Sequence, residues 1–206
     1  MALVAPYSVE AYNSLPHLLD AHQNFVNADP MELLHNEIGE LFYKHDVYRD
    51  LAVCLLHRHF PMTDGEKLVE FGSVASPWSY RQQDTDLMGG RVKARSWMFR
   101  KGRLLAYEFG YDNTRSGSTY GDLPEKPAFY LEFGQLLERN HLEDILGLTL
   151  LGDGLQPGTM KLEKTFGNTN VMFVVAEEDW DQGKESIIAQ WEYKEDGKGA
   201  TMPVRK

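Results

Sequence analysis

Residues 46–78 read DVYRDLAVCLLHRHFPMTDGEKLVEFGSVASPW, and this stretch decides the fold. It contains a continuous apolar run, Leu51–Leu56, followed by the only His-x-His sequence of the chain, His57-Arg58-His59. A short apolar run that ends near a proline, here Pro61, favours a buried β-strand over a helix. We therefore predict a strand from about Ala52 to Phe60, with both histidines inside it.

The residues after this strand predict a hairpin. Thr63-Asp64-Gly65 is typical of a tight turn, and residues 67–72 alternate enough to form the return strand. Because side chains alternate along a strand, one face of the first strand would carry four residues, Val53, Leu55, His57 and His59. An apolar inner face of the sheet would then direct both imidazoles inward.

The rest of the chain has further segments of helical or strand periodicity. Helices are predicted over 14–26, 30–44 and 127–140, where apolar residues recur at helical spacing. Strands are predicted over 93–99, 103–109, 145–151, 160–166, 171–175 and 187–193, and loops over 75–81 and 111–126.

This order of elements predicts the fold class α+β. We expect a mostly antiparallel curved sheet of hairpins, with a barrel-like closure as the alternative, and about three helices, two of them N-terminal. The length of 206 residues suits a single domain over 1–206. Its ends are expected to be a loose N-terminal lead-in at 1–12 and a polar C-terminal tail at 195–206.

Composition excludes several classes of function. A net charge of -10 repels phosphate backbones and anionic lipid heads, so we expect neither nucleic-acid nor membrane partners. No apolar stretch is long enough to cross a bilayer. The single cysteine, Cys54, allows neither an internal disulfide nor a cysteine-based zinc site. These features predict a cytoplasmic protein, and a protein partner or a homo-oligomer stays open.

The His-x-His sequence predicts a metal site. Two imidazoles on one face of a strand lie about 6 to 7 Å apart along the chain. At this spacing His57 and His59 can chelate one divalent ion, with Asp64 as the first candidate for a further ligand and Glu66, Glu70 and His141 as the others. The pattern resembles that of the cupin barrels, in which an acidic ligand follows His-x-His after a few residues. The upstream glycine and the second histidine-bearing segment of that family are missing here, so no cupin function is carried over.

The same residues also support acid–base chemistry without a metal. A carboxylate beside an imidazole favours its protonated form and allows it to relay protons. The candidate catalytic residues are therefore His57, His59, Glu66 and Glu70. The structural alternative is that one or both imidazoles bond to backbone or carboxylate groups at a strand end.

Aromatic and arginine side chains near this strand are candidates for ligand binding. Trp78, Tyr80 and Trp97 could line an apolar cavity, although core packing is their ordinary role. Arg81 could anchor a carboxylate, although a surface ion pair is the simpler role. The chain matches neither the phosphate-loop nor the dinucleotide pattern, so a nucleotide cofactor is not expected.

The segments LLHRHF, EKLVEFG and ASPW, in that order, are similar to segments of a family of uncharacterised small fungal proteins. The resemblance covers about the middle third of the chain. It implies no activity and no site residues.

Two functions follow from these patterns. The first is a small-molecule-binding protein, with enzymatic activity left open, whose pocket is centred on the His-x-His strand and uses metal-assisted or histidine acid–base chemistry. The second is a non-catalytic interaction module that docks a protein partner through its acidic surface and the loop at 111–126.

Overall fold

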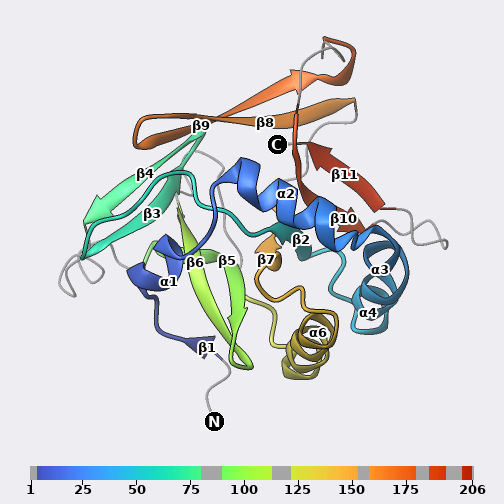
Figure 1. The fold of residues 1–206 in the computed structure, drawn as a ribbon. Coiled ribbons are helices and arrows are strands. Elements are labelled where there is room, and N and C mark those ends of the chain that lie inside the picture. The colour runs from blue at the N-terminus through green and yellow to red at the C-terminus, as the bar shows by residue number, and fades with distance from the viewer. Residues whose placement is uncertain are drawn as a thin grey trace.

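The computed structural model describes residues 4–79, 90–112, 122–152, 158–179 and 186–193, and the backbone of residues 201–205. Its strands form one curled sheet, with the order β11-β10-β2-β7-β5-β6-β3-β4-β9-β8 and with β1 beside β6 (Figure 1). The strands are β1 (Val4–Ala5), β2 (Leu51–Leu55), β3 (Glu66–Phe71), β4 (Val74–Ser79), β5 (Val92–Arg100), β6 (Arg103–Tyr111), β7 (Leu146–Leu150), β8 (Thr159–Phe166), β9 (Thr169–Ala176), β10 (Ile188–Tyr193) and β11 (Thr201–Arg205).

The sheet is mostly antiparallel, which confirms the predicted α+β class. Among the described strands, the parallel pairs are β1 with β6 and β3 with β6. The two ends of the strand order curl toward one another, since the backbones of β11 and β8 lie close together. The barrel-like alternative is therefore realised as a half-barrel.

Strand β2 lies in the interior of the sheet, third from the β11 end of the strand order, and is buried on both faces. It pairs with β7 on one side and with β10 on the other. Val53 and Leu55 belong to the larger apolar cluster, whereas Cys54 and Leu56 belong to a second cluster on the opposite face. Burial on both faces explains why this segment is continuously apolar instead of alternating.

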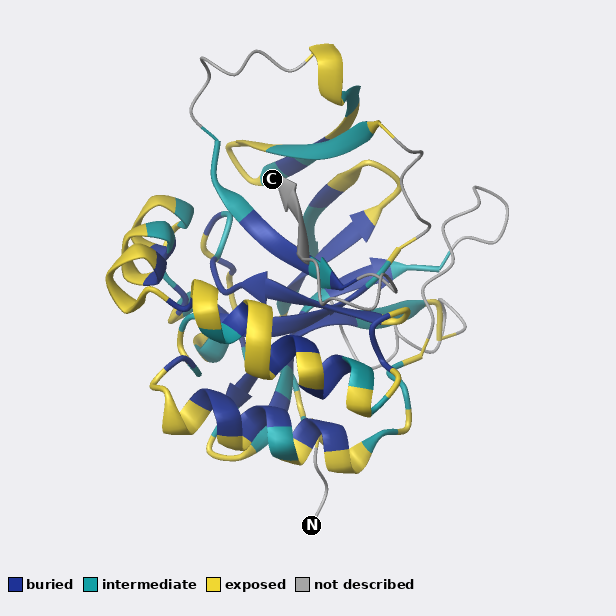
Figure 2. Ribbon diagram, turned by 90° about the vertical axis from the view of Figure 1, so that its right-hand side faces the viewer, coloured by how far each residue is buried: buried dark blue, intermediate teal, exposed yellow. Residues whose placement is uncertain are grey.

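The helices cover the sheet with their buried sides inward (Figure 2). The larger cluster takes side chains from α2, from the helical stretch that follows it and from α6, and the second cluster takes Val9 and Tyr12 of α1. The helical elements are α1 (Val9–Asn13), α2 (Leu18–Ala28), α3 (Met31–Leu33), the π-helical turn η1 (Leu34–Ile38), α4 (Gly39–Lys44), α6 (Pro127–Arg139) and the 3₁₀ turn η2 (Glu177–Asp179).

Two of the three predicted helices are confirmed in extent. The helix predicted over 30–44 is one continuous stretch from α3 through η1 to α4, and α6 matches the prediction over 127–140. The helix predicted over 14–26 begins later, at Leu18, because Pro16 separates it from α1. The segment expected to be a loose lead-in, residues 1–12, contains β1 and most of α1.

Three predictions for the deciding stretch, two of strands and one of a loop, were wrong. β2 ends at Leu55 and not at Phe60. The predicted return strand, β3, does not pair with β2, because β2 is already paired on both edges and β3 lies between β4 and β6. The predicted loop at 75–81 begins as strand β4, which pairs with β3 through the turn at Gly72.

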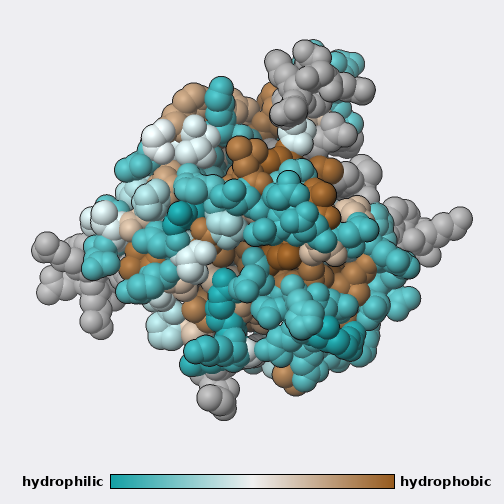
Figure 3. Space-filling model, viewed as in Figure 1, coloured by the Kyte–Doolittle hydropathy of each residue, from teal (hydrophilic) through white to brown (hydrophobic). Residues whose placement is uncertain are grey.

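The surface contains hydrophilic and apolar areas. The face in Figure 3 is mainly hydrophilic, with hydrophobic patches beside α2 and below the β8–β9 hairpin. Exposed apolar residues on these two elements include Leu19, Val26, Phe166 and Phe173. Within the described residues, the helices are too short and too polar to cross a lipid bilayer.

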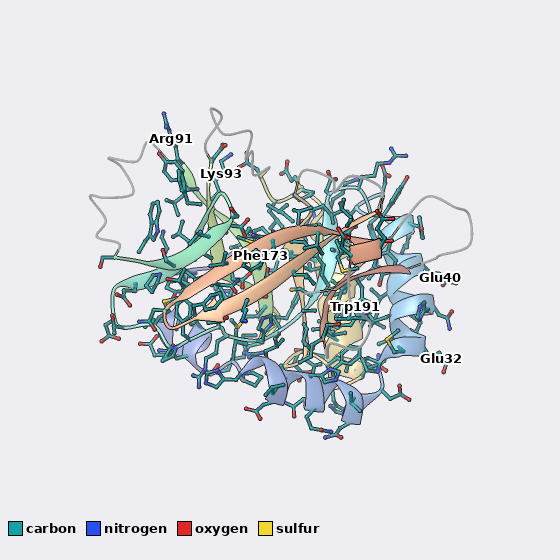
Figure 4. The ribbon with its side chains drawn as sticks, turned by 90° about the horizontal axis from the view of Figure 1, so that it is seen from above. Glu32, Glu40, Arg91, Lys93, Phe173 and Trp191 are labelled. Atoms are coloured by element: carbon teal, nitrogen blue, oxygen red, sulfur yellow. The ribbon has the colours of Figure 1, made fainter. Side chains whose placement is uncertain are left out.

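The β8–β9 hairpin crosses over the sheet, as the view from above shows (Figure 4). Leu162 pairs with Phe173, and Glu163 pairs with Met172. Since paired residues share a face and neighbours alternate, Glu163 lies on the face opposite Phe173. This alternation directs Glu163 toward the histidines.

Candidate metal and acid–base site

The His57–His59 segment lies just beyond the end of β2. The amide of Leu56 still donates a hydrogen bond to the carbonyl of Ile145, but the amide of Arg58 donates to the carbonyl of Pro16, outside the sheet. The chain therefore leaves the sheet after Leu55. The predicted single row of Val53, Leu55, His57 and His59 on one strand was wrong for this reason, and the His59 ring lies beside Phe60 of the second apolar cluster.

His57 is buried and held in one orientation. Its side chain Nδ1 lies 2.9 Å from the carbonyl oxygen of Leu55, which can only accept, so Nδ1 carries the hydrogen. Burial, and next the neighbouring His59, lower the pKa of His57 to about 4. The ring is consequently neutral near pH 7, and Nε2 keeps its lone pair.

His59 lies between two carboxylates. Its Nε2 is 3.4 Å from Oε1 of Glu108 and 4.0 Å from Oε2 of Glu163, and its ring centroid lies 4.9 Å from that of His57. The side chains of His59, Glu108 and Glu163 are 7%, 12% and 9% exposed. Thr165 Oγ1 lies 3.5 Å from Nδ1 of His59, at the limit of a hydrogen bond.

Both carboxylates are oriented by neighbouring strands. The Asn170 amide of β9 donates to Glu163 of β8 over 3.2 Å. The Ser96 hydroxyl of β5 donates to Glu108 of β6 over 2.7 Å and lies 3.0 Å from the hydroxyl of Thr149 on β7. The sheet therefore fixes the acids, and the segment after β2 brings the imidazoles to them.

These groups border a small recess. It is lined by His59, Leu68, Glu70, Ala75, Arg95, Glu108, Phe109, Glu163 and Asn170. The recess has a volume of ≈ 10 Å³, which is room for about one water molecule and is far below the roughly 300 to 1,000 Å³ of ordinary ligand pockets. The recess therefore suits an ion, a water or a very small polar group better than a whole metabolite.

A charged network forms one wall of the recess. Arg95 pairs directly with Glu70, and Lys161 Nζ lies 3.7 Å from the other oxygen of the same carboxylate. With Glu108 and Glu163, these described groups carry three negative and two positive charges when both imidazoles are neutral. A cation bound beside these three acids would therefore lower the electrostatic energy of the site.

The donor set fits a divalent transition metal. His57, His59 and Glu163 each offer a ligand atom, and these atoms lie within 4.8 Å of one another. Ligands of a tetrahedral ion with bonds of about 2.1 Å are about 3.4 Å apart, so modest side-chain rotation closes the group around an ion. The hydrogen bond from Nδ1 of His57 to a carbonyl is the outer-shell contact that metal-binding histidines usually make.

The structure brings only part of the predicted site together. Glu70 lines the recess but is paired with Arg95, whereas Asp64 lies exposed on the turn after Pro61 and is absent from the metal-binding group. The carboxylate of Glu66 accepts a hydrogen bond from the amide of Thr63 over 3.0 Å, in the same turn.

Two of the predicted ligand-binding aromatics, Trp78 and Trp97, are not part of the recess lining. Trp97 is buried in the larger apolar cluster, and Trp78 packs against that cluster with its ring centroid 5.7 Å from that of Tyr111. Tyr80 and Arg81 lie outside the described residues. The ligand-binding role of these four residues stays a prediction.

Sequence reasoning missed the acids that complete the site. Glu108 and Glu163 are about 50 and 100 residues away from the histidines, and single acids in an acidic chain carry no local signal. The one local signal for Glu163 is the alternation of side chains in TMKLEKTF, which places Glu163 and the apolar Leu162 on opposite faces of the strand. The residues that contact the Glu163 face of this strand depend on the order of strands in the sheet. The sequence pattern does not predict that order.

No family model, curated protein or solved structure matches the chain. The site therefore has to be interpreted from its own geometry.

Proposed function

We propose that this protein binds a divalent transition-metal ion through His57, His59 and Glu163 and uses it to bind or transform a small polar molecule. The observation that carries the proposal is the meeting of two imidazoles and a carboxylate from separate segments, with one imidazole already fixed as a neutral ligand. Two nitrogens and a carboxylate oxygen suit Zn²⁺, Fe²⁺ or Mn²⁺ better than Ca²⁺ or Mg²⁺.

Three protein ligands leave coordination positions for water or substrate, as in catalytic metal sites. A bound ion of this kind polarises a ligand oxygen or lowers the pKa of a bound water. Glu108 lies beside His59 and is held by Ser96. It is therefore placed to act as a fourth ligand or as a base near the ion.

The test is metal binding by the purified full-length protein after treatment with a chelator. We expect about one Zn²⁺ or Co²⁺ per chain, as for a single site, measured by elemental analysis and by titration of the Co²⁺ absorption bands. His57→Gln and Glu163→Gln should weaken binding at least about tenfold.

His35→Gln is the matched control. The Nδ1 of His35 also bonds to a backbone carbonyl, that of Met31, over 2.7 Å, but this residue is exposed on the surface. Wild-type protein that takes up no more metal than either site variant would rule out the metal site.

A second candidate is acid–base chemistry by His59 without a metal, favoured by its 3.4 Å contact with Glu108. Ligand-dependent thermal shifts of the metal-free protein across small polar metabolites would reveal it, because a ligand of the native state stabilises by mass action. Loss of such a shift in Glu108→Gln, with metal binding absent in the wild type, would favour this candidate. The interaction-module alternative rests on a loop, 111–126, that falls largely outside the described residues.

A further inference from the structure

We propose that Asn13, the last residue of helix α1, is a positioning residue that holds the His57–His59 segment in its ligand-presenting conformation. The inference deepens the metal-binding proposal and rests on it for its functional meaning. Its structural content is that a short N-terminal helix, far from the histidines in sequence, sets the geometry of the site.

Asn13 makes a reciprocal pair of hydrogen bonds with the backbone of Met62. Its side-chain Nδ2 donates to the Met62 carbonyl over 2.8 Å, and its Oδ1 accepts from the Met62 amide over 2.8 Å. The side-chain amide of Asn13 therefore satisfies both the donor and the acceptor of the Met62 backbone, as a neighbouring strand would. The contact fixes the segment at a point three residues after His59.

The other end of the segment is fastened at Arg58. Its backbone amide donates to the Pro16 carbonyl over 2.9 Å, and it forms an isolated parallel bridge with His17. Its guanidinium donates to the carbonyl of Asn13 and lies 3.4 Å from Nε2 of His17. His59 is thus enclosed between two attachments, both made to the stretch from Asn13 to His17.

Helix α1 also supplies the surface beneath the segment. Tyr12 is fully buried in the second apolar cluster together with Phe60 and Met62. Helix α1 and the residues that follow His59 therefore share one apolar cluster.

These attachments matter because the segment has left the sheet. Between β2 and β3 it lies outside the strand ladder, so other contacts have to offset the conformational entropy lost when it is ordered. A metal or catalytic site tolerates only about 0.5 Å of displacement of its ligands. Without the Asn13 clamp, the segment would sample positions in which the imidazoles no longer meet Glu163.

The test compares Asn13→Ala with Asn140→Ala. Asn140 also donates through Nδ2 to a backbone carbonyl over 2.8 Å, that of Leu136, but it lies at the end of α6, away from the site. Arg58→Lys is the second site variant, in case Asn13→Ala does not fold. The readouts are the imidazole ¹⁵N resonances of the metal-free protein and the Co²⁺ titration with its absorption spectrum.

We expect Asn13→Ala to shift the His57 and His59 imidazole resonances, to weaken Co²⁺ binding about tenfold or more, and to change the Co²⁺ spectrum. Asn140→Ala should lower stability by a similar amount and leave all three readouts unchanged. Unchanged imidazole resonances in both Asn13→Ala and Arg58→Lys would overturn the positioning role. If the wild type binds no Co²⁺ but the resonances still move in Asn13→Ala, the metal proposal fails and the positioning role holds.

Discussion

His57 shows how one buried side chain couples the site to the stability of the fold. Its ring is shielded from water and its Nδ1 hydrogen is used by a carbonyl, so adding a proton at Nε2 would place a charge in a poorly solvated position. The same burial that keeps Nε2 available as a ligand makes the folded state lose stability in acid.

The pH dependence of stability follows from this. In the unfolded chain the pKa of His57 is near its ordinary value of 6.5, whereas in the folded protein it is about 4. Between these values the unfolded state binds more protons, so the free energy of unfolding falls as the pH is lowered through this window and is unaffected above it. The full shift corresponds to at most about 3 kcal/mol.

Urea denaturation of wild type and His57→Gln between pH 4.5 and 7.5 measures this effect. The wild type should lose more stability than the variant as the pH falls from 6.5, because only the wild type carries the His57 imidazole. The other titrating groups are shared by both proteins. Parallel curves for the two proteins would show that His57 is protonated as readily in the folded state as in the unfolded chain.

At the scale of single elements, β7 shows how tightly the central strands pack. A Cβ added to Gly147 would lie 2.5 Å from the carbonyl oxygen of Trp97 and 2.6 Å from Leu56 Cδ2. The first neighbour is backbone of the adjacent strand and cannot move away without breaking the sheet. Overpacking of this kind typically costs about 1 to 3 kcal/mol or more.

Gly147→Ala should therefore lower the free energy of unfolding by about 3 kcal/mol. Gly152→Ala is the control, because a Cβ there meets nothing within 4 Å, and it should change stability by less than about 0.5 kcal/mol. Thermal and urea unfolding of both variants provide the measurement. Equal stability of the two would mean that β7 does not lie as closely against β5 as described.

The elements that could be predicted from sequence are those defined by local signals. The hairpin of β5 and β6 was evident because its turn, Arg100-Lys101-Gly102, lies between two alternating segments, and Lys101 and Gly102 both adopt positive φ. The β8–β9 hairpin, with Gly167 in its turn, was evident for the same reason. Helix α6 was visible from its apolar stripe.

The partners of β2 and the end of β2 could not be predicted in this way. Its pairing with β7 and β10 depends on residues about 95 and 135 positions later in the chain. The strand stops at Leu55 because the residues after it form hydrogen bonds with the stretch from Asn13 to His17 instead. One of these bonds joins Arg58 to Asn13, 45 residues earlier in the chain. The histidines were found from sequence, but their direction and their acidic neighbours were set by these distant contacts.

At the scale of the whole molecule, the excess of acidic groups opposes compaction. The net charge of -10 is spread over a surface on which Glu32 and Glu40 lie on the helical side, while Arg91 and Lys93 lie at the opposite side (Figure 4). Several ion pairs, such as Lys44–Glu132 and Arg139–Glu37, are largely exposed and contribute little. Repulsion among the excess acidic groups should therefore outweigh the stabilisation from these ion pairs.

Raising NaCl from about 20 to about 200 mM should consequently increase the melting temperature by a few degrees, equivalent to about 1 kcal/mol. The effect should appear equally in the metal-free protein and in Glu163→Gln, since the long-range charge is nearly the same in both. A melting temperature that falls with salt would show that the surface ion pairs dominate instead.

The position of β2 between β7 and β10 has a consequence for the synthesis of the chain. A ribosome completes LAVCLL long before it reaches either neighbouring strand, since β7 begins at Leu146 and β10 at Ile188. During that interval the nascent chain carries an apolar strand with two open edges, the kind of segment that chaperones cover and that aggregates when left bare. The central strand of the finished sheet is thus its most vulnerable segment during translation.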